Sequence, residues 1–81
     1  RMADAIDRRS RYLRDFAHAI SHEFKTPLSG IRGTLEILGD HGANMSAEER
    51  SRFLANADAD ASRLTMLLGR LLELARADLG A

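Results

Sequence analysis

The sequence predicts an all-α chain, and three observations support this fold class. Apolar residues recur every three or four positions along two long segments, which places them on one face of a helix. No segment alternates apolar and polar residues as a half-buried strand does. A short stretch with two glycines and an asparagine separates the two periodic segments. We therefore predict a two-helix antiparallel hairpin.

The first helix is predicted to run from near the amino end to about residue 39. Its apolar positions stay in phase across Pro27, so we expect one bent helix rather than two helices. Proline has no N–H to give the carbonyl of Glu23, and its ring crowds that carbonyl. The positions in phase are Leu13, Phe16, Ala17, Ile20, Phe24, Leu28, Ile31, Leu35 and Leu38.

The connection is predicted over residues about 40–46, and the second helix over about 47–79. The stretch GDHGANMS has the composition of a helix end followed by a turn. Ser46 and Glu49 have the spacing of a capping box, so the second helix should begin at about Ala47. Its apolar positions are Phe53, Leu54, Ala57, Ala61, Leu64, Leu67, Leu68, Leu71, Leu72, Ala75 and Leu79.

The apolar stripe of the second helix is too wide for an isolated hairpin. Leu67 with Leu68, and Leu71 with Leu72, double the positions that face a partner helix. An antiparallel pair of helices buries only one seam, so part of each stripe would stay in water. We therefore expect the hairpin to form a homodimer, in which two copies close a four-helix bundle.

Composition narrows the possible partners. The 12 basic and 12 acidic residues balance, which argues against a nucleic acid or an anionic membrane surface as a direct partner. There is no cysteine, and no apolar run approaches the roughly 20 residues that span a bilayer. The sequence begins at Arg1 within a charged, helical-looking segment without a capping residue, so we expect it to be part of a longer protein.

His22 is the candidate nucleophile. At about 100° per residue, it lies opposite Ile20 and Ile31 and therefore points to water. An unperturbed imidazole is largely neutral at cellular pH and has a free lone pair. Glu23 would accept the proton of the other ring nitrogen, which raises nucleophilicity. An equally good interpretation of Glu23 is a surface charge paired with a basic side chain.

A stripe of small residues continues from His22 toward the carboxyl end of the same helix. Glycine inside a helix costs about 1 kcal/mol relative to alanine, so small size at these positions needs a reason. A partner that approaches closely would supply it, and the alternative is a neutral surface that tolerates small residues. The residues of this stripe are Thr26, Ser29, Gly30 and Gly33.

Metal and nucleotide chemistry are disfavoured. The segment HEFKT begins like the zinc motif H-E-x-x-H, but its fifth position is Thr26. His18 lies one turn before His22, and without a third ligand this pair would hold stray divalent metal only weakly. No glycine-rich phosphate loop is present. We expect no physiological metal site and no bound cofactor.

The segment FAHAISHEFKTPLSGIRGTLEIL, residues 16–38, resembles the H-box of sensor histidine kinases of bacterial two-component systems. The pattern is F-x-x-x-x-S-H-E-[LF]-[RK]-T-P-L, followed by an aliphatic helix. The later segment RLTMLLGRLLELARAD is similar to the closing helix of their dimerisation and histidine phosphotransfer (HisKA-type) domain. The H-box residues matched are Phe16, Ser21, His22, Glu23, Lys25, Thr26, Pro27 and Leu28.

The resemblance implies a role for several of these residues. His22 would accept the γ-phosphoryl group of ATP and pass it to an aspartate in the receiver domain of a response regulator. Glu23 would act as acid/base partner, and Thr26 would position the water that dephosphorylates the regulator. Pro27 would be the hinge between kinase and phosphatase arrangements. The regulator would dock at Thr26, Ser29, Gly30 and Gly33.

The resemblance also implies a domain organisation. Residues 1–11 would end an upstream signalling helix that continues into the first helix, and residues 12–81 would form the phosphotransfer domain. ATP and Mg²⁺ would bind a separate catalytic domain, so the chain would be an inactive part of a histidine protein kinase when alone. It would lie in the cytoplasm, as the intracellular part of a membrane-anchored sensor.

Two other interpretations stay open. The chain would be a purely structural dimeric hairpin if His22 were incidental. A monomeric phosphotransfer bundle is disfavoured, because it requires four helices in one polypeptide and the sequence predicts two.

Overall fold

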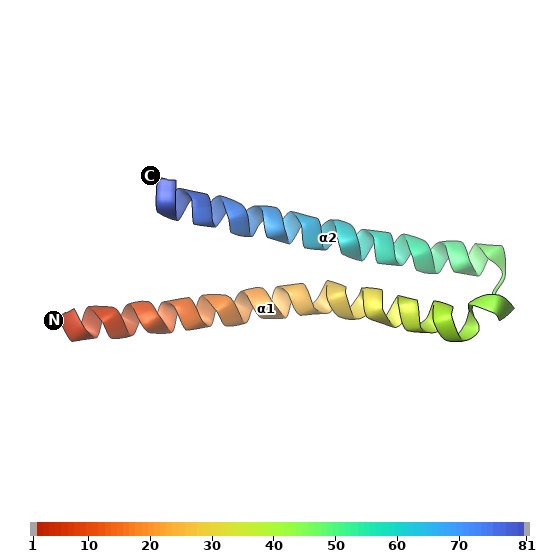
Figure 1. Cartoon of the computed structure of the whole chain (residues 1–81), viewed down its shortest axis with the longest axis horizontal. Helices are drawn as coiled ribbons and strands as arrows, with labels where there is room; N and C mark the ends of the chain where they lie inside the picture. The colour runs from red at the N-terminus through yellow and green to blue at the C-terminus, as the bar shows by residue number, and fades with distance from the viewer. Residues whose placement is uncertain (1, 81) are drawn as a thin grey trace.

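Two long antiparallel helices make up the molecule (Figure 1). The computed structural model describes residues 2–80, except for the side chains of residues 2–4, 6 and 78–80, so Arg1 and Ala81 lie outside it. α1 spans Met2–His41, the 3₁₀ turn η1 spans Gly42–Asn44, and α2 spans Ala47–Gly80. Residues 2–80 contain no strand, so the predicted helical hairpin is confirmed. Its pairing with a second copy stays a prediction.

The hairpin is long and thin, with extents of 65 × 23 × 12 Å. α1 runs without interruption across residue 11, where the sequence placed the end of a signalling helix, and the role of that segment stays a prediction. Neither helix, over the residues described, has an apolar stretch long enough to cross a bilayer.

Pro27 lies inside α1 and does not end it. The ribbon of α1 changes direction near its middle, where its colour passes from orange to yellow (Figure 1). This is the bend expected where a proline ring displaces a backbone hydrogen bond. The side chain of Pro27 is less than 2% exposed. Since a two-helix molecule encloses side chains mainly between its helices, Pro27 lies in the seam, on the face of α1 that meets α2.

The seam encloses few side chains fully. Among the described side chains, only Pro27, Thr34 and Leu67 are buried. Other apolar side chains along the seam are half-buried, so the hairpin has a narrow core of its own. These half-buried residues are Phe16, Ile20, Phe24, Ile31 and Leu38 of α1, and Phe53, Ala57, Leu64 and Leu71 of α2.

A second apolar face is left uncovered. The leucines of this face on α1 lie about 40–100° around the helix axis from Pro27, and those on α2 lie about 100–140° from Leu67, in the same sense of rotation. Pro27 and Leu67 both face the seam, and the two helices run in opposite directions. The two sets of leucines therefore lie on the same side of the hairpin. All six side chains are about half exposed or more. This open apolar face consists of Leu13, Leu28, Leu35, Leu54, Leu68 and Leu72.

α1 passes through Gly39 and ends at His41, close to the end predicted at about residue 39. No glycine among the described residues has a positive φ, which is the conformation of a glycine helix cap. The helix instead tightens into η1. Arg50 then donates from Nη2 to the carbonyl oxygens of Gly42 at 2.9 Å and Met45 at 3.5 Å.

The predicted capping box begins α2. The Ser46 N–H donates to Oε1 of Glu49 at 3.0 Å, and the Glu49 N–H donates to Oγ of Ser46 at 3.1 Å. These bonds satisfy backbone donors that the first turn leaves without helical partners. The bond from the Ser46 backbone is the main cause that lowers the pKa of Glu49 below its usual value of 4.5.

Gly30 of α1 lies against α2. A Cβ atom built at Gly30 would contact Oδ2 of Asp60 and lie 3.1 Å from its Cγ. Gly33 lies nearly one turn further along α1, and a Cβ atom there would have nothing within 4 Å. The absence of a side chain at Gly30 therefore permits the close approach of Asp60, whereas Gly33 adjoins open space.

We expect acid to weaken the hairpin through Glu49. Its pKa is lower in the folded chain, so its stabilising contribution is present above about pH 4.5 and is lost as pH falls through the folded value. Thermal unfolding followed by circular dichroism should show Tm falling with acid, and falling less in Glu49→Gln. A pH dependence unchanged in Glu49→Gln would contradict this account.

Replacing each of Gly30 and Gly33 with alanine should distinguish the effect of helix propensity on stability from the effect of packing against α2. Gly33→Ala should raise the free energy of unfolding by up to about 1 kcal/mol, the ordinary gain inside a helix. Gly30→Ala should gain less, because it must displace Asp60. In an Asp60→Ala background, Gly30→Ala should gain as much as Gly33→Ala. Urea unfolding at fixed protein concentration measures these differences, and equal gains at both glycines in the original background would refute the packing role.

Candidate functional site

His22 is exposed on the outer face of α1, as predicted. It lies about 140° around the helix from Pro27, which faces the seam. It also lies about 120–180° from Leu13, Leu28 and Leu35 of the open apolar face. A reacting group in solvent therefore has access to the His22 ring even if another helix covers that apolar face.

The ring of His22 stands next to the ring of His18. Their centroids are 5.1 Å apart, and their planes meet at 76°, an edge-to-face arrangement. Both residues are exposed. Residues four apart on a helix are neighbours on one face. The sequence spacing indicated this pair, and the structure adds that the two rings are in contact.

Glu23 and Thr26 are exposed on α1, and both follow His22 along the chain. The Thr26 side chain lies about 40° from that of His22 and one turn further on, so both border the same patch of surface. Glu23 lies about 100° from His22, because adjacent helix residues do not face each other. A group bound at His22 would therefore lie near the Thr26 hydroxyl, one turn toward the carboxyl end of α1. The Glu23 carboxylate would lie on the side of that group nearer to α2.

The four small residues predicted to form one docking stripe do not share one environment. Thr26 and Ser29 are exposed on the face of His22, and Gly33 is half-buried with open space at its Cβ position. Gly30 instead adjoins Asp60 of α2. Packing within the hairpin therefore explains the small size of Gly30 without any docking partner.

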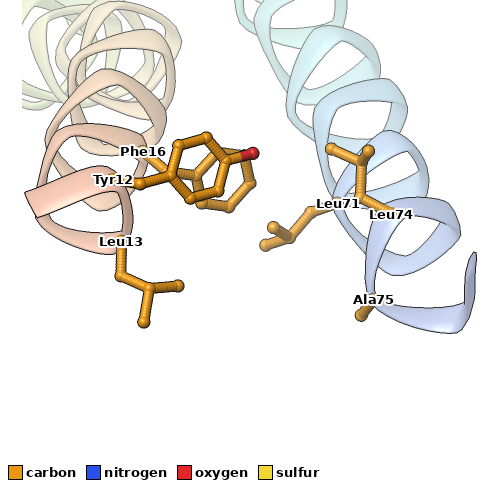
Figure 2. A pocket seen from close by; sticks show the side chains of 6 residues that line it. All are labelled: Tyr12, Leu13, Phe16, Leu71, Leu74 and Ala75. Carbon is orange, nitrogen blue, oxygen red and sulfur yellow. The ribbon is translucent and has the colours of Figure 1, made fainter. Parts of the chain in front are cut away.

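Sequence reasoning did not find the apolar groove at the open end of the hairpin (Figure 2). The rings of Tyr12 and Phe16 stack, with centroids 6.3 Å apart and planes at 22°. Figure 2 shows both rings extending from α1 toward Leu71 of α2. Helical periodicity places such residues on one apolar face, but it does not give the distance between the two helices, which determines whether a groove lies between them. The residues that line the groove are Tyr12, Leu13, Phe16, Leu71, Leu74 and Ala75.

Residues 12–80 match the model of the family described as His Kinase A (phospho-acceptor) domain. The chain is 36% identical over 61 residues to Drug sensory protein A of Synechocystis, which covers 75% of this chain and 9% of that protein. It is 34% identical over 80 residues to the signal transduction histidine-protein kinase BaeS of Escherichia coli, with coverages of 99% and 16%. No solved structure matches the chain.

A further relative is the sensor histidine kinase MtrB of Mycobacterium tuberculosis. It is 32% identical over 87 residues, which cover 98% of this chain and 15% of that protein. The chain thus spans between 9% and 16% of the length of these three relatives. The matched region includes most of α1, all of α2 and the exposed His22. On this match, and with the helical hairpin that carries it, the chain belongs to the His Kinase A (phospho-acceptor) domain family.

Proposed function

We propose that His22 accepts the γ-phosphoryl group of ATP and passes it to an aspartate in the receiver domain of a response regulator. The observation that carries this proposal is the exposed imidazole at His22, within a chain of the phospho-acceptor family. ATP and Mg²⁺ would be held by a separate catalytic domain, which brings the nucleotide to the outer face of α1. The chain would then be part of a cytoplasmic region of a membrane-linked sensor.

The reaction at His22 requires a lone pair and an outlet for a proton. The unprotonated ring nitrogen attacks the γ-phosphorus, the bond to the ADP oxygen breaks, and ADP leaves with that electron pair. The other ring nitrogen keeps its proton and becomes more acidic as positive charge develops on the ring. Glu23 would accept a hydrogen bond from this N–H or take the proton, which stabilises the charged ring. The phosphoryl group then passes from nitrogen to the regulator's carboxylate oxygen.

The open apolar face supports a homodimer. Fully burying one leucine side chain contributes about 1.5–3 kcal/mol, and the six leucines on this face are still about half exposed or more. A second copy related by a twofold axis would place α1 of one protomer against α2 of the other and close a four-helix bundle. Since His22 lies on the opposite side of α1 from this face, the bundle would cover the leucines and leave the imidazole in water.

The surface that follows His22 is suited to the regulator. Thr26 and Ser29 present short polar side chains, and Gly33 presents none. A partner helix can therefore approach the backbone of α1 closely here, within reach of His22. Thr26 would position the water that attacks the phosphorylated aspartate of the regulator, which gives the domain a phosphatase activity. Pro27 would act as the hinge, because its bend lies in the same turn.

Phosphorylation by a separately purified ATP-binding domain tests this function. With labelled ATP, the chain should take up label that is lost in acid and kept in base, and His22→Gln should take up none. The matched control is His41→Gln, an exposed histidine at the end of α1, which should be labelled like the original chain. Absence of label in the original chain would instead favour a purely structural dimeric hairpin.

The same assay assigns Glu23 and Thr26. Glu23→Gln should slow phosphorylation by about 10²–10⁴-fold, the usual range for an acid/base group, without change in helical content. Thr26→Ala should leave phosphorylation of His22 unchanged and slow dephosphorylation of the regulator. If Thr26→Ala slowed both reactions equally, a packing effect would replace the water-positioning role, and an unchanged rate in Glu23→Gln would remove Glu23 from the mechanism.

A further inference from the structure

His18 is a second imidazole at the site that the phosphoryl transfer described above does not use. Its ring lies edge-to-face with that of His22, at a centroid separation of 5.1 Å. Both side chains project into solvent from one helix, which also carries the buried Pro27 about two and a half turns from His18. The spacing of the two residues is therefore set by the backbone of α1 and not by a mobile loop.

The separation of the rings fits a shared metal ion. A histidine nitrogen binds Zn²⁺ at about 2.0–2.1 Å, which puts each ring centroid about 3.2 Å from the metal. Two imidazoles at a tetrahedral angle around one ion then have centroids about 5.2 Å apart, and at a right angle about 4.5 Å. The observed 5.1 Å lies within this range. In the edge-to-face arrangement the two rings do not yet share a coordination point, so binding requires rotation of these exposed side chains between rotamers.

We propose that His18 and His22 form a two-imidazole chelate for a divalent transition metal, and that the bound metal prevents His22 from accepting a phosphoryl group. The consequence for phosphorylation rests on the proposed function, whereas the chelate itself does not. A neutral imidazole has one nitrogen with a lone pair and one N–H. The metal and the phosphoryl group therefore compete for the lone pair on the unprotonated nitrogen of His22, whichever of the two nitrogens that is.

The ligand set determines which metals would bind. Imidazole suits Zn²⁺, Ni²⁺ and Cu²⁺, and affinity rises from Ni²⁺ to Cu²⁺ in the usual order for divalent metals. Mg²⁺ prefers oxygen ligands, so the Mg²⁺ that accompanies ATP would not occupy the pair. Among the described residues, no group of three or more histidine and carboxylate side chains is arranged to hold a metal. Water would fill the other positions, and the metal would exchange readily.

Calorimetric titration of the unphosphorylated, untagged chain tests the chelate directly. Cu²⁺ and Ni²⁺ should each bind at one ion per chain, Cu²⁺ more tightly. His18→Ala and His22→Ala should each weaken binding at least tenfold. Loss of a group that only hydrogen-bonds to a metal ligand already lowers affinity by about 10–100-fold, and these variants remove a ligand itself. His41→Ala is the control and should bind as the original chain does. Equal affinity in His18→Ala and the original chain would overturn the proposal.

Phosphorylation by the ATP-binding domain with Ni²⁺ added tests the consequence. Labelling of the original chain should fall as Ni²⁺ approaches its measured Kd, while His18→Ala should be labelled normally and keep its label at the same Ni²⁺ concentration. Equal inhibition of both would locate the effect in the ATP-binding domain and overturn the competition. If neither chain were labelled without metal, the proposed function would fail, and the titration would still decide the chelate.

Discussion

The contact of one narrow face of α1 with α2 determines the rest of this structure. Once the buried Pro27 turns toward α2, the helical repeat fixes the direction of every other side chain on α1. The leucines of the open apolar face follow on one flank, and His22 lies on the far side. The same rotation also sets Gly30 against Asp60. A single packing contact thus separates the open apolar face from the face that carries His22.

The narrowness of that contact explains why the hairpin should not persist alone. Ordering a residue costs about 1–2 kcal/mol of backbone entropy, and helices gain most of their stability from packing of an apolar face. Here three described side chains are buried while six leucines of the open apolar face remain exposed. Association would therefore supply much of the stability.

The sequence predicted the features that depend on neighbours along the chain. The two helices, the capping box of Ser46 and Glu49, the bend at Pro27 and the exposure of His22 all follow from spacing within one segment. It did not predict the contact of Gly30 with Asp60, because that depends on the rotation of α2 relative to α1. Nor did it predict the 3₁₀ turn that follows His41, or the hydrogen bond that Arg50 donates to the carbonyl oxygen of Gly42. Contact between His18 and His22 depends on side-chain rotamers, which residue spacing leaves open.

The central claim is that a second copy covers the open apolar face. Sedimentation equilibrium of the chain measures this most directly, combined with circular dichroism at the same concentrations to confirm that the chain is helical. The account predicts a helical particle of twice the 9.0 kDa chain mass, which dissociates and loses helix together when Leu35 on that face is replaced by glutamate. A helical particle that stays at 9.0 kDa at every concentration would contradict it.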